Sequence, residues 1–272
     1  MTSRLTLTSD AIAAEATLLD QAEIDATQIR QTTEVHPHMT IDDAYAIQSA
    51  WRERKLARGE AMVGHKIGLT SRAMQQAMNI TTPDSGFLTD RMIFPADSEL
   101  RAADFCDPKL EIELAFVLAE DLAGSDLSVD HVLDATDHVI PAIELIAARS
   151  FRRDPTSGRT RTVLDTIADN AADAGIVTGG TAVSPREVDL RWVSALGYRN
   201  GVIEETGVAA GVLDHPALGI VWLARRYAEQ GLTLEAGQTI LAGSFTRPID
   251  IRPADEFRFD YGPLGSFTLR FS

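Results

Sequence analysis

The chain has 272 residues, of which 44% are hydrophobic and 24% charged, so it can bury a sizeable core and is not typical of a disordered protein. Its net charge of -15 argues against a nucleic-acid or anionic-membrane partner, because phosphate groups are bound by clustered positive charge. With a single cysteine, no signal-peptide pattern and no apolar run of about 18 residues, the sequence predicts a cytoplasmic protein without an intrachain disulfide or a membrane span.

Two helices are predicted at the start of the chain. Residues 9 to 30 have apolar residues at helical spacing, with Ser9 as the candidate N-cap. A second helix is predicted from Thr40, its N-cap, to the residues just before Gly59, with acids in its first turn and bases towards its end. Together they predict a helical amino-terminal lobe over residues 1 to 61, followed by a larger domain over residues 62 to 272.

Residues 62 to 71 are predicted to form a strand that carries a lysine between two glycines. The period of two places Gly64, Lys66 and Gly68 on one face of this strand and His65 on the other. A ligand could therefore approach Lys66 closely, and a lysine in an apolar setting can act as an acid or a base. A surface lysine that extends from a strand explains the pattern equally well.

The next stretch is predicted to be a short helix and a turn. Ser71 could cap a helix over residues 72 to 79, and residues 82 to 86, Thr-Pro-Asp-Ser-Gly, are typical of a turn. Asp84 lies within this turn. Turn chemistry explains its presence fully, and a catalytic role is an additional hypothesis.

Residues 110 to 118, Leu-Glu-Ile-Glu-Leu-Ala-Phe-Val-Leu, predict a strand in which two acids interrupt an apolar run. Glu111 and Glu113 share one face of this strand, and their neighbours on that face are small or apolar. Repulsion between two partly buried carboxylates is costly unless a cation or a proton intervenes, which favours a bound metal ion. The alternative is an edge strand whose polar face is exposed to solvent.

A second apolar run, residues 139 to 146, contains one acid, Glu144. Three carboxylates from two apolar strands predict an oxygen-only site for Mg²⁺ or Mn²⁺, with coordination positions left for water or substrate.

An arginine-rich loop follows at residues 149 to 161. This loop has a single acid, Asp154, against five arginines: Arg149, Arg152, Arg153, Arg159 and Arg161. It is either a solvated loop or a lid that recognises an anion, since guanidinium pairs bidentately with carboxylate. A helix is predicted after it, over residues 163 to 172.

The last hundred residues are predicted to be rich in strands. Asn200-Gly201 between two strand-like runs is a strong hairpin signal, and alternating aromatic residues on both sides of residues 262 to 265 predict another. His215-Pro216 opens a helix between them. Helices first and strands later predict an α+β fold with a rolled, barrel-like mixed sheet.

Seven segments together resemble one enzyme family from about residue 40 to the carboxyl terminus. They are GHKIGLTS at 64 to 71, PDSG at 83 to 86, LEIELAFVLA at 110 to 119, ATDHVIPAIELI at 135 to 146, DTIADNAADAG at 165 to 175, YRNGVIEETGVAAGVLDHP at 198 to 216 and AGSFTRP at 242 to 248. The family is the 2-keto-4-pentenoate hydratase and oxalocrotonate decarboxylase branch of the fumarylacetoacetate hydrolase superfamily. Members often have an aspartate where this chain has Ala147, which leaves the three glutamates intact but alters the surroundings of Arg149.

The resemblance implies a role for ten residues. Glu111, Glu113 and Glu144 would hold Mg²⁺, in agreement with the strand pattern, while Lys66 and Asp84 would act at the reacting carbons. The residues implied in substrate binding are His65, Arg149, Arg161, Asp165 and Thr246.

The activity that the resemblance implies is the addition of water to a 2-hydroxy-2,4-dienoate in meta-cleavage aromatic catabolism, as in 4-hydroxyphenylacetate degradation, with 2-oxo-hept-4-ene-1,7-dioate as the expected substrate. Decarboxylation of 2-oxo-3-hexenedioate is the nearest alternative. Hydrolysis of an acylpyruvate fits less well, because the N-Y-x-x-H-x-x-E pattern is missing, and a non-catalytic binding subunit would not need these acids and the lysine. The resemblance also implies a homo-oligomer, up to dimers assembled into a decamer, and a partner decarboxylase.

Overall fold

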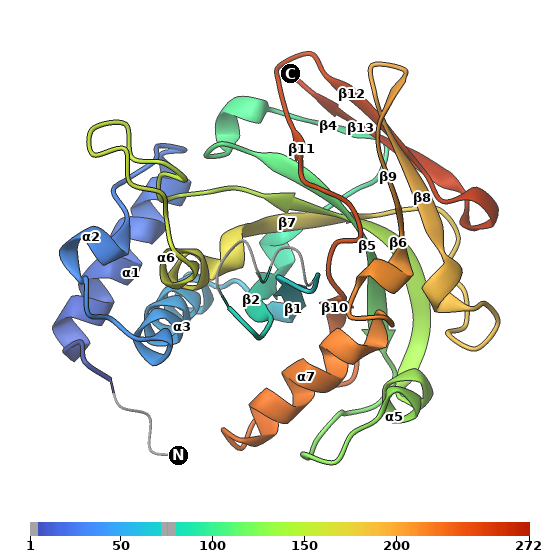
Figure 1. Ribbon diagram of the computed structural model, residues 1–272, viewed down its shortest axis with the longest axis horizontal. Helices are drawn as coiled ribbons and strands as arrows, with labels where there is room; N and C mark the ends of the chain where they lie inside the picture. Colours follow the sequence, from blue (N-terminus) through green and yellow to red (C-terminus); the bar gives the residue numbers. More distant parts are fainter. Residues whose placement is uncertain (1–4, 72–74, 76–79) are drawn as a thin grey trace.

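The computed structural model describes residues 5–71, 75 and 80–272, and within these residues the chain forms a helical lobe and two β-sheets (Figure 1). The helices are α1 (Ser9–Ile24), α2 (Thr32–Val35), α3 (Ile41–Ala57), α5 (Val129–Asp134), α6 (Val163–Ala168) and α7 (Ala217–Ala228). The strands are β1 (Met62–Gly68), β2 (Asp84–Thr89), β3 (Ile93–Phe94), β4 (Ser98–Leu100), β5 (Lys109–Leu118), β6 (Thr136–Ile146), β7 (Asp173–Thr178), β8 (Ser194–Arg199), β9 (Val202–Val208), β10 (Thr239–Leu241), β11 (Ile249–Asp250), β12 (Glu256–Asp260) and β13 (Ser266–Phe271).

Both sheets are mixed. In the larger one the order is β2-β1-β10-β5-β6-β7-β3, with β11 paired to β5, and in the smaller one it is β4-β13-β12-β8-β9, as far as the described residues go. The pairs β1–β10, β3–β7 and β4–β13 are parallel, and the others are antiparallel. This confirms the predicted α+β class with a helical amino-terminal part and a curled mixed sheet.

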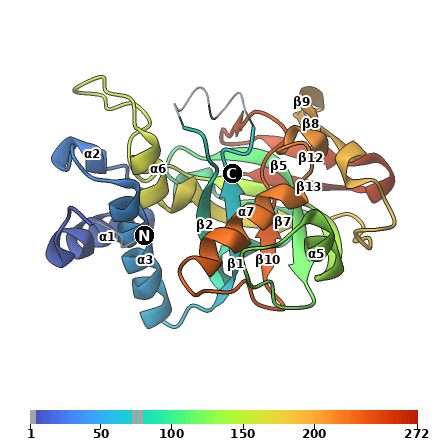
Figure 2. The ribbon, with the colours of Figure 1, turned by 60° about the horizontal axis from the view of Figure 1, so that its bottom comes forward.

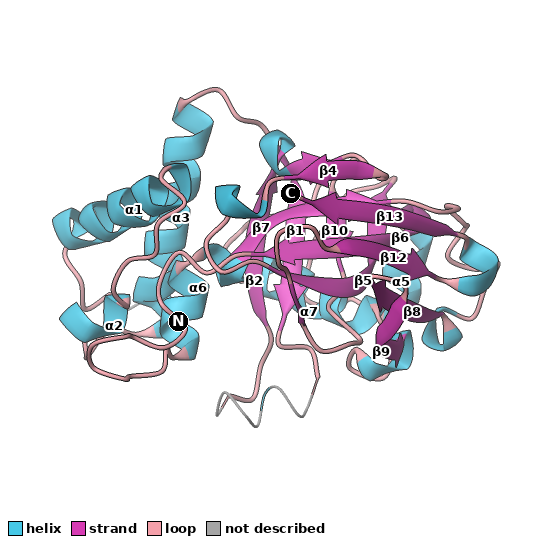
Figure 3. Ribbon diagram, turned by 90° about the horizontal axis from the view of Figure 1, so that it is seen from above, coloured by secondary structure: helices cyan, strands magenta, loops and turns pink. Residues whose placement is uncertain are grey.

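The helical lobe lies at one end of the molecule and the sheets at the other (Figure 3). Helices α1, α3 and α6 stand together beside the edge of the larger sheet that carries β2, while α7 lies across β1 and β10 (Figure 2). The lobe is joined to the sheet by a shared core, in which Trp51 of α3 meets Phe87 of β2 with ring centroids 6.1 Å apart. The boundary at residues 61 and 62 stays a prediction.

Side chains alternate between the two sides of β5, and one of these sides carries only apolar residues. Leu110, Ile112, Leu114, Phe116 and Leu118 are all buried and pack against the smaller sheet, as the period of two predicts. The opposite side of β5 faces the helical lobe, where Ala115 belongs to the second core cluster. Glu111 and Glu113 therefore point into the space between the larger sheet and the lobe.

The predicted helix ends are confirmed for α3 and wrong for α1. Thr40 caps α3 with the reciprocal hydrogen bonds of a capping box, formed with Asp43. Helix α1 is capped by Thr8 instead of Ser9 and stops at Ile24, well before residue 30. It stops because the chain turns back through Ala26, at φ 47°, and reaches the loop that begins at Arg149.

The later elements follow the prediction in part: residues 84–86, predicted as part of a turn over 82 to 86, belong to strand β2, which pairs with β1. Asn200 and Gly201 have φ values of 52° and 81°, which suit the tight hairpin between β8 and β9, and β12 and β13 form the second hairpin. The predicted helix over 163 to 172 ends at Ala168. The predicted helix over 72 to 79 falls on residues 72–74 and 76–79 and so lies outside the described residues, apart from Gln75.

None of the helices in the described part of the chain is long and apolar enough to cross a membrane.

Candidate active site

The register between β5 and β6 brings the three glutamates together. Glu111 and Glu144 are direct neighbours across the two strands, and Glu113 lies two residues further along the same face of β5. One carboxylate oxygen from each residue lies within 4.8 Å of the others. Like charges placed opposite each other destabilise a sheet, so this pairing indicates a function other than stability.

Burial gives these carboxyl groups unusual proton affinities. It raises the pKa of Glu111 to about 7, with a further contribution from the charge of Glu144. Burial also raises the pKa of Glu144 to about 7, although the neighbouring charge of Lys66 acts in the opposite direction. The pKa of Glu113 lies well above its ordinary value because of burial and the charges of the other two glutamates.

Two neighbours hold the acid-bearing strands in place. The backbone N–H of Gly243 donates to Oε2 of Glu113 at 2.8 Å. The hydroxyl of Tyr261 lies 3.0 Å from the carbonyl oxygen of Glu113 and 2.7 Å from that of Ala142, and so bridges β5 and β6 from the other side of the sheet. Tyr261 therefore supports the register that the site requires.

Lys66, on strand β1 of the same sheet, extends towards the three glutamates. Its Nζ lies 3.1 Å from Oε1 of Glu144 and donates to the carbonyl oxygen of Ala171 at 2.9 Å. Burial alone would lower the pKa of Lys66, but the charges of Glu144, Asp84 and other nearby acids outweigh burial and raise it. A bound cation would offset these charges and lower the pKa of Lys66.

Asp84, the first residue of β2, lies close to Lys66 at the position of a glycine, Gly68. Gly68 pairs with Asp84 across β1 and β2, and a Cβ at Gly68 would lie 2.3 Å from Oδ1 of Asp84 and 3.0 Å from Nζ of Lys66. The glycine therefore leaves the space that the two functional groups occupy. Burial raises the pKa of Asp84, against the opposing charge of Lys66. Gly64 has a different role, because its missing side chain lets the backbone of β10 approach.

Two hollows open beside these residues and meet at Glu111. The first has a volume of about 230 Å³, and the residues that line it include Lys66, Asp84, Glu111 and Arg161. The second, of about 320 Å³, is lined on its far side by Ser244, Phe245 and Thr246. Glu111 and Pro248 belong to both walls, so a small, elongated substrate could extend from one hollow into the other.

Comparison with known sequences decides the family. The chain is 54% identical over 253 residues to the 2-oxo-hept-4-ene-1,7-dioate hydratase of Escherichia coli, an alignment that covers 93% of this chain and 95% of that enzyme. The chain belongs to the 2-keto-4-pentenoate hydratase and oxalocrotonate decarboxylase branch of the fumarylacetoacetate hydrolase superfamily. No family model matches it.

Solved structures agree with membership of this hydratase and decarboxylase branch. The 4-oxalocrotonate decarboxylase from Pseudomonas putida G7, complexed with magnesium and adipate, superposes with a TM-score of 0.94 at 35% identity, over 99% of this chain and 100% of that one. A Yersinia pestis CO92 protein assigned to the fumarylacetoacetate hydrolase family has a TM-score of 0.57 at 16% identity, over 78% of this chain and 94% of that one, and shows the fold alone.

The donor atoms of the site fit the hard divalent metal that this family resemblance implied. All three ligand candidates are carboxylates, and Oε1 of Glu113 and Oε2 of Glu144 are buried with no hydrogen-bond partner among the described residues. Buried anionic oxygens without partners are costly, and a cation that prefers oxygen ligands would satisfy them. The cluster can therefore hold a metal ion.

Two of the residues expected to bind substrate lie at the hollows. Arg161 lines the first hollow, its side chain is 8% exposed, and its Nη1 lies 3.5 Å from Oδ2 of Asp169 without a full hydrogen bond to any described residue. Burial lowers the pKa of Arg161 to about 10. Thr246 lines the second hollow.

Two others, His65 and Asp165, are not brought to either hollow. His65 points to the opposite side of β1 from Lys66, where its Nδ1 lies 3.0 Å from the hydroxyl of Tyr227, and burial lowers its pKa to about 4. Asp165 accepts hydrogen bonds from the backbone N–H groups of Thr162 and Thr33 at 2.8 Å each, so it caps α6 and ties it to α2. The expectation that these side chains contact the substrate stays a prediction.

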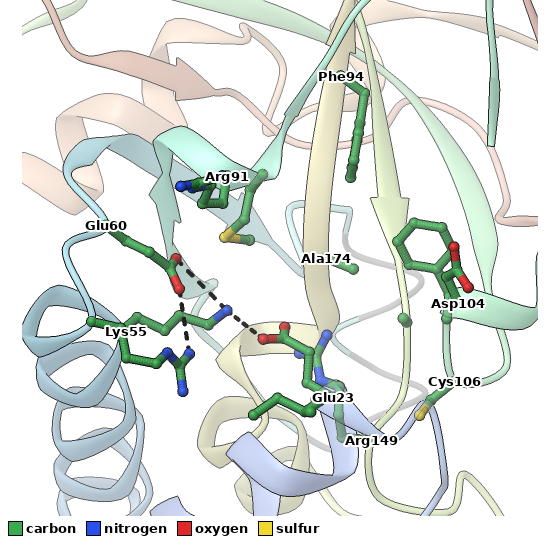
Figure 4. A pocket seen from close by; sticks show the side chains of 14 residues that line it. Glu23, Lys55, Glu60, Arg91, Phe94, Asp104, Cys106, Arg149 and Ala174 are labelled. Carbon is green, nitrogen blue, oxygen red and sulfur yellow. Dashed lines mark hydrogen bonds and ion pairs between the residues drawn. The ribbon is translucent and has the colours of Figure 1, made fainter. Parts of the chain in front are cut away.

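Arg149 also lies away from the three glutamates. It lines the largest of the described cavities, of about 470 Å³, between the helical lobe and β7 (Figure 4). Its guanidinium is 1% exposed, lies 4.9 Å from the Trp51 ring centroid and donates to Asp169 and to the backbone of Asp173. These partners already occupy the guanidinium, and the expectation that Arg149 contacts the substrate stays a prediction.

Sequence patterns assigned no individual role to several neighbours of the site. Arg152 and Thr160, which belong to the arginine-rich loop, line the first hollow together with Thr166 of α6. Asp173 is fully buried, and burial raises its pKa to about 7 against the opposing charge of Lys66. No local pattern distinguishes it from the other acids of the DTIADNAADAG segment, because its role depends on contacts with residues far along the chain.

Proposed function

We propose that the chain is a divalent-metal-dependent hydratase that converts a 2-hydroxy-2,4-dienoate, or its 2-oxo-4-enoate tautomer, to a 4-hydroxy-2-oxo acid. The preferred substrate in this proposal is 2-oxo-hept-4-ene-1,7-dioate, the compound named for the E. coli relative. The observation that carries the proposal is the convergence of Lys66, Asp84 and Glu111 in one hollow, with the buried carboxylates of Glu113 and Glu144 clustered next to Glu111.

In this proposal Glu111, Glu113 and Glu144 hold Mg²⁺, with Mn²⁺ as a substitute. When bound, the ion would act as a Lewis acid towards the carboxylate and the neighbouring 2-oxo oxygen of the substrate. Gly243 keeps one oxygen of Glu113 in place through its N–H, and Oε1 of Glu113 and Oε2 of Glu144, which have no hydrogen-bond partner among the described residues, would be available to hold the ion.

Lys66 and Asp84 carry out the proton transfers. The substrate dienol loses its hydroxyl proton and gains a proton at C5, which leaves an α,β-unsaturated ketone. Water then adds its hydroxyl group to C4 and a proton to C3. Both side chains are nearly fully buried, at 3% and 1% exposure, so each proton passes between groups in a fixed arrangement from which bulk water is largely excluded.

Arg161 is the candidate that recognises the second carboxylate of a seven-carbon substrate. Losing a charge-assisted hydrogen bond costs about 1.5 to 3 kcal/mol, so Arg161→Ala should lower kcat/KM by roughly ten- to hundred-fold on the dicarboxylate. The effect should be much smaller on 2-hydroxypenta-2,4-dienoate, which lacks that group. Arg153→Ala is the matched control, because Arg153 is an exposed arginine of the same loop. Equal losses on both substrates would show that Arg161 does not read the distal carboxylate.

The affinity for Mg²⁺ should rise with pH between about 6 and 8. Burial brings the pKa values of Glu111 and Glu144 to about 7, so below that pH an arriving ion must displace protons from them. Each displaced proton weakens binding by about tenfold per pH unit. Calorimetric titration with Mg²⁺ at three pH values measures this slope, and an affinity that stays constant over the range would contradict it.

The decarboxylase reaction is the second candidate, because a relative of known structure with 35% identity and a TM-score of 0.94 is a 4-oxalocrotonate decarboxylase. Incubation with Mg²⁺ and each dienoate, followed by NMR of the products and measurement of CO₂, separates the reactions. Hydration without CO₂ supports the proposal. Release of CO₂ supports a decarboxylase, and cleavage of a carbon–carbon bond would support an acylpyruvate-type hydrolase.

The assembly state and the setting are further parts of the proposal. We expect a homo-oligomer, with dimers that associate up to a decamer, a partner decarboxylase that receives or supplies the dienoate, and a cytoplasmic location in meta-cleavage aromatic catabolism. Several large apolar side chains are available for association between subunits: Trp192, Val202 and Ile203 are 72%, 67% and 50% exposed. Light scattering of the purified protein measures the number of subunits.

A further inference from the structure

Three consecutive residues next to Lys66 have a left-handed backbone. Asn170, Ala171 and Ala172 have φ values of 51°, 50° and 65°, and we call residues 170–172 the left-handed turn. Only glycine, and less often asparagine, adopts this conformation without strain, so two alanines in succession need strong support from their surroundings. Strained backbone that is maintained in this way is concentrated at functional sites.

The side chain of Asn170 fastens the turn to β2. Its Oδ1 accepts a hydrogen bond from the N–H of Phe87 at 2.8 Å, and its Nδ2 donates to the carbonyl oxygen of Phe87 at 3.0 Å. Gly86 permits this close approach, because a Cβ there would lie 2.6 Å from the backbone oxygen of Asn170. The amide of Asn170 therefore binds the edge strand as another strand would.

Arg149 fastens both ends of the same turn. On the side before the turn, its Nε donates to Oδ1 of Asp169 at 2.6 Å and its Nη2 donates to the Asp169 carbonyl oxygen at 2.7 Å. On the other side, its Nη1 donates to the carbonyl oxygen of Asp173 at 3.0 Å. The guanidinium is fixed in turn by the face of Trp51, which lies behind it on α3.

The turn presents one backbone group to the catalytic lysine. The carbonyl oxygen of Ala171 accepts a hydrogen bond from Nζ of Lys66 at 2.9 Å, and Ala171 and Ala172 form part of the wall of the first hollow. A right-handed continuation of α6 would have turned this carbonyl along the helix axis, away from Lys66.

We propose that the left-handed turn is a positioning device for the Lys66 amine, and that Asn170 is the positioning residue that holds it. A backbone carbonyl can accept an N–H from lysine whether the amine carries three hydrogens or two. The Ala171 carbonyl can therefore keep Nζ in one place before and after the amine loses a proton. A carboxylate partner, by contrast, favours only the charged form of the amine. The proposal rests on the proposed function to the extent that Lys66 transfers protons to the substrate.

The main test is Asn170→Ala, which removes both hydrogen bonds to Phe87. Misplacement of a reacting group by about 1 Å can cost roughly 10²-fold in rate, so we expect kcat to fall by about ten- to hundred-fold. KM and the Mg²⁺ affinity should change little, because the turn contacts none of the three glutamates through a hydrogen bond that the structure shows among its described residues.

A second measurement detects a change in the position of the Lys66 amine and does not depend on enzyme activity. The chain has only three lysines, Lys55, Lys66 and Lys109, so selective ¹⁵N labelling gives a simple spectrum of the side-chain amines. The Lys66 signal is assigned by its loss in Lys66→Arg. In Asn170→Ala this signal should shift and its hydrogens should exchange with water at least about tenfold faster, as a buried hydrogen bond is lost. If the wild-type protein did not hydrate dienoates, the proposed function would fail and this spectrum would still decide the positioning role.

Gln48→Ala is the matched control. Gln48 is another buried amide that donates two hydrogen bonds to backbone carbonyls, those of Ser85 and Ile167 at 2.8 Å each, and neither bond involves the turn. It should lower stability to a similar extent but leave kcat and the Lys66 signal near their wild-type values. If Asn170→Ala fails to fold, Asn170→Gly replaces it, because glycine keeps the left-handed backbone while lacking the amide.

Two outcomes would overturn the proposal. One is a wild-type kcat and an unchanged Lys66 signal in the folded Asn170 variant. The other is an equal loss of kcat in Gln48→Ala, which would mean that any weakening of this core slows the reaction.

Discussion

Exhaustive chelation of divalent cations is expected to abolish turnover, and Mg²⁺ or Mn²⁺ is expected to restore it. The physical reason is the cluster of Glu111, Glu113 and Glu144, in which one oxygen of each residue lies within 4.8 Å of the others and the described residues supply too few donors to neutralise three charges. Lys66 supplies one positive charge close to Glu144, and a divalent ion would balance the rest.

Glu113→Gln tests the same site by removing the charge of one candidate metal ligand, with little change in the shape of the side chain. It should weaken Mg²⁺ binding by at least about tenfold. Even replacing a residue that only supports a metal ligand lowers metal affinity by about tenfold or more. Activity should then require more metal, and calorimetry and the dependence of rate on Mg²⁺ should agree. Glu120→Gln is the control, since Glu120 is an exposed acid just after the same strand. Full activity in the thoroughly chelated wild-type protein would rule out a metal-dependent reaction.

Replacement of Lys66 by alanine is expected to lower kcat by about 10²- to 10⁴-fold, the usual contribution of a general acid or base. Lys66→Arg should not restore the rate, because a guanidinium does not give up its proton in this pH range. Both variants should be compared in saturating Mg²⁺, since loss of the ammonium leaves the buried carboxylate of Glu144 without its ion-pair partner.

The decisive measurement is deuterium exchange from solvent at C3 and C5 of a 2-oxo-4-enoate, followed by NMR alongside hydration. A proton-transfer role predicts that Lys66→Ala slows exchange and hydration together. Lys109→Ala should leave both unchanged, because the ammonium of Lys109 pairs with Asp250 at the surface, 2.6 Å away. A folded alanine variant that exchanges and hydrates at the wild-type rate would remove Lys66 from the mechanism.

Short-range patterns in the sequence determined a large part of this fold. The capping box of Thr40, the tight turn at Asn200 and Gly201, and the alternation of β5 each depend on residues that are close along the chain. The same alternation placed Glu111 and Glu113 on one face, and the interruption of a second apolar run pointed to Glu144. These features are predictable because backbone geometry alone sets the periods and the caps.

Only the tertiary structure decided how these parts meet. The register that sets Glu144 opposite Glu111 depends on pairing along the whole of β5 and β6, and a shift of one residue would turn the acids to the other face. Arg149 resembled the other arginines of its loop, yet its guanidinium is buried against Trp51. The predicted helix over 163 to 172 stops at Ala168, and the left-handed turn that follows depends on Arg149 and Phe87, which lie 20 and 83 residues away from their partners Asp169 and Asn170. Contacts over such separations decide conformation against local propensity, because burial and hydrogen bonding in the folded core outweigh the small preferences of single residues.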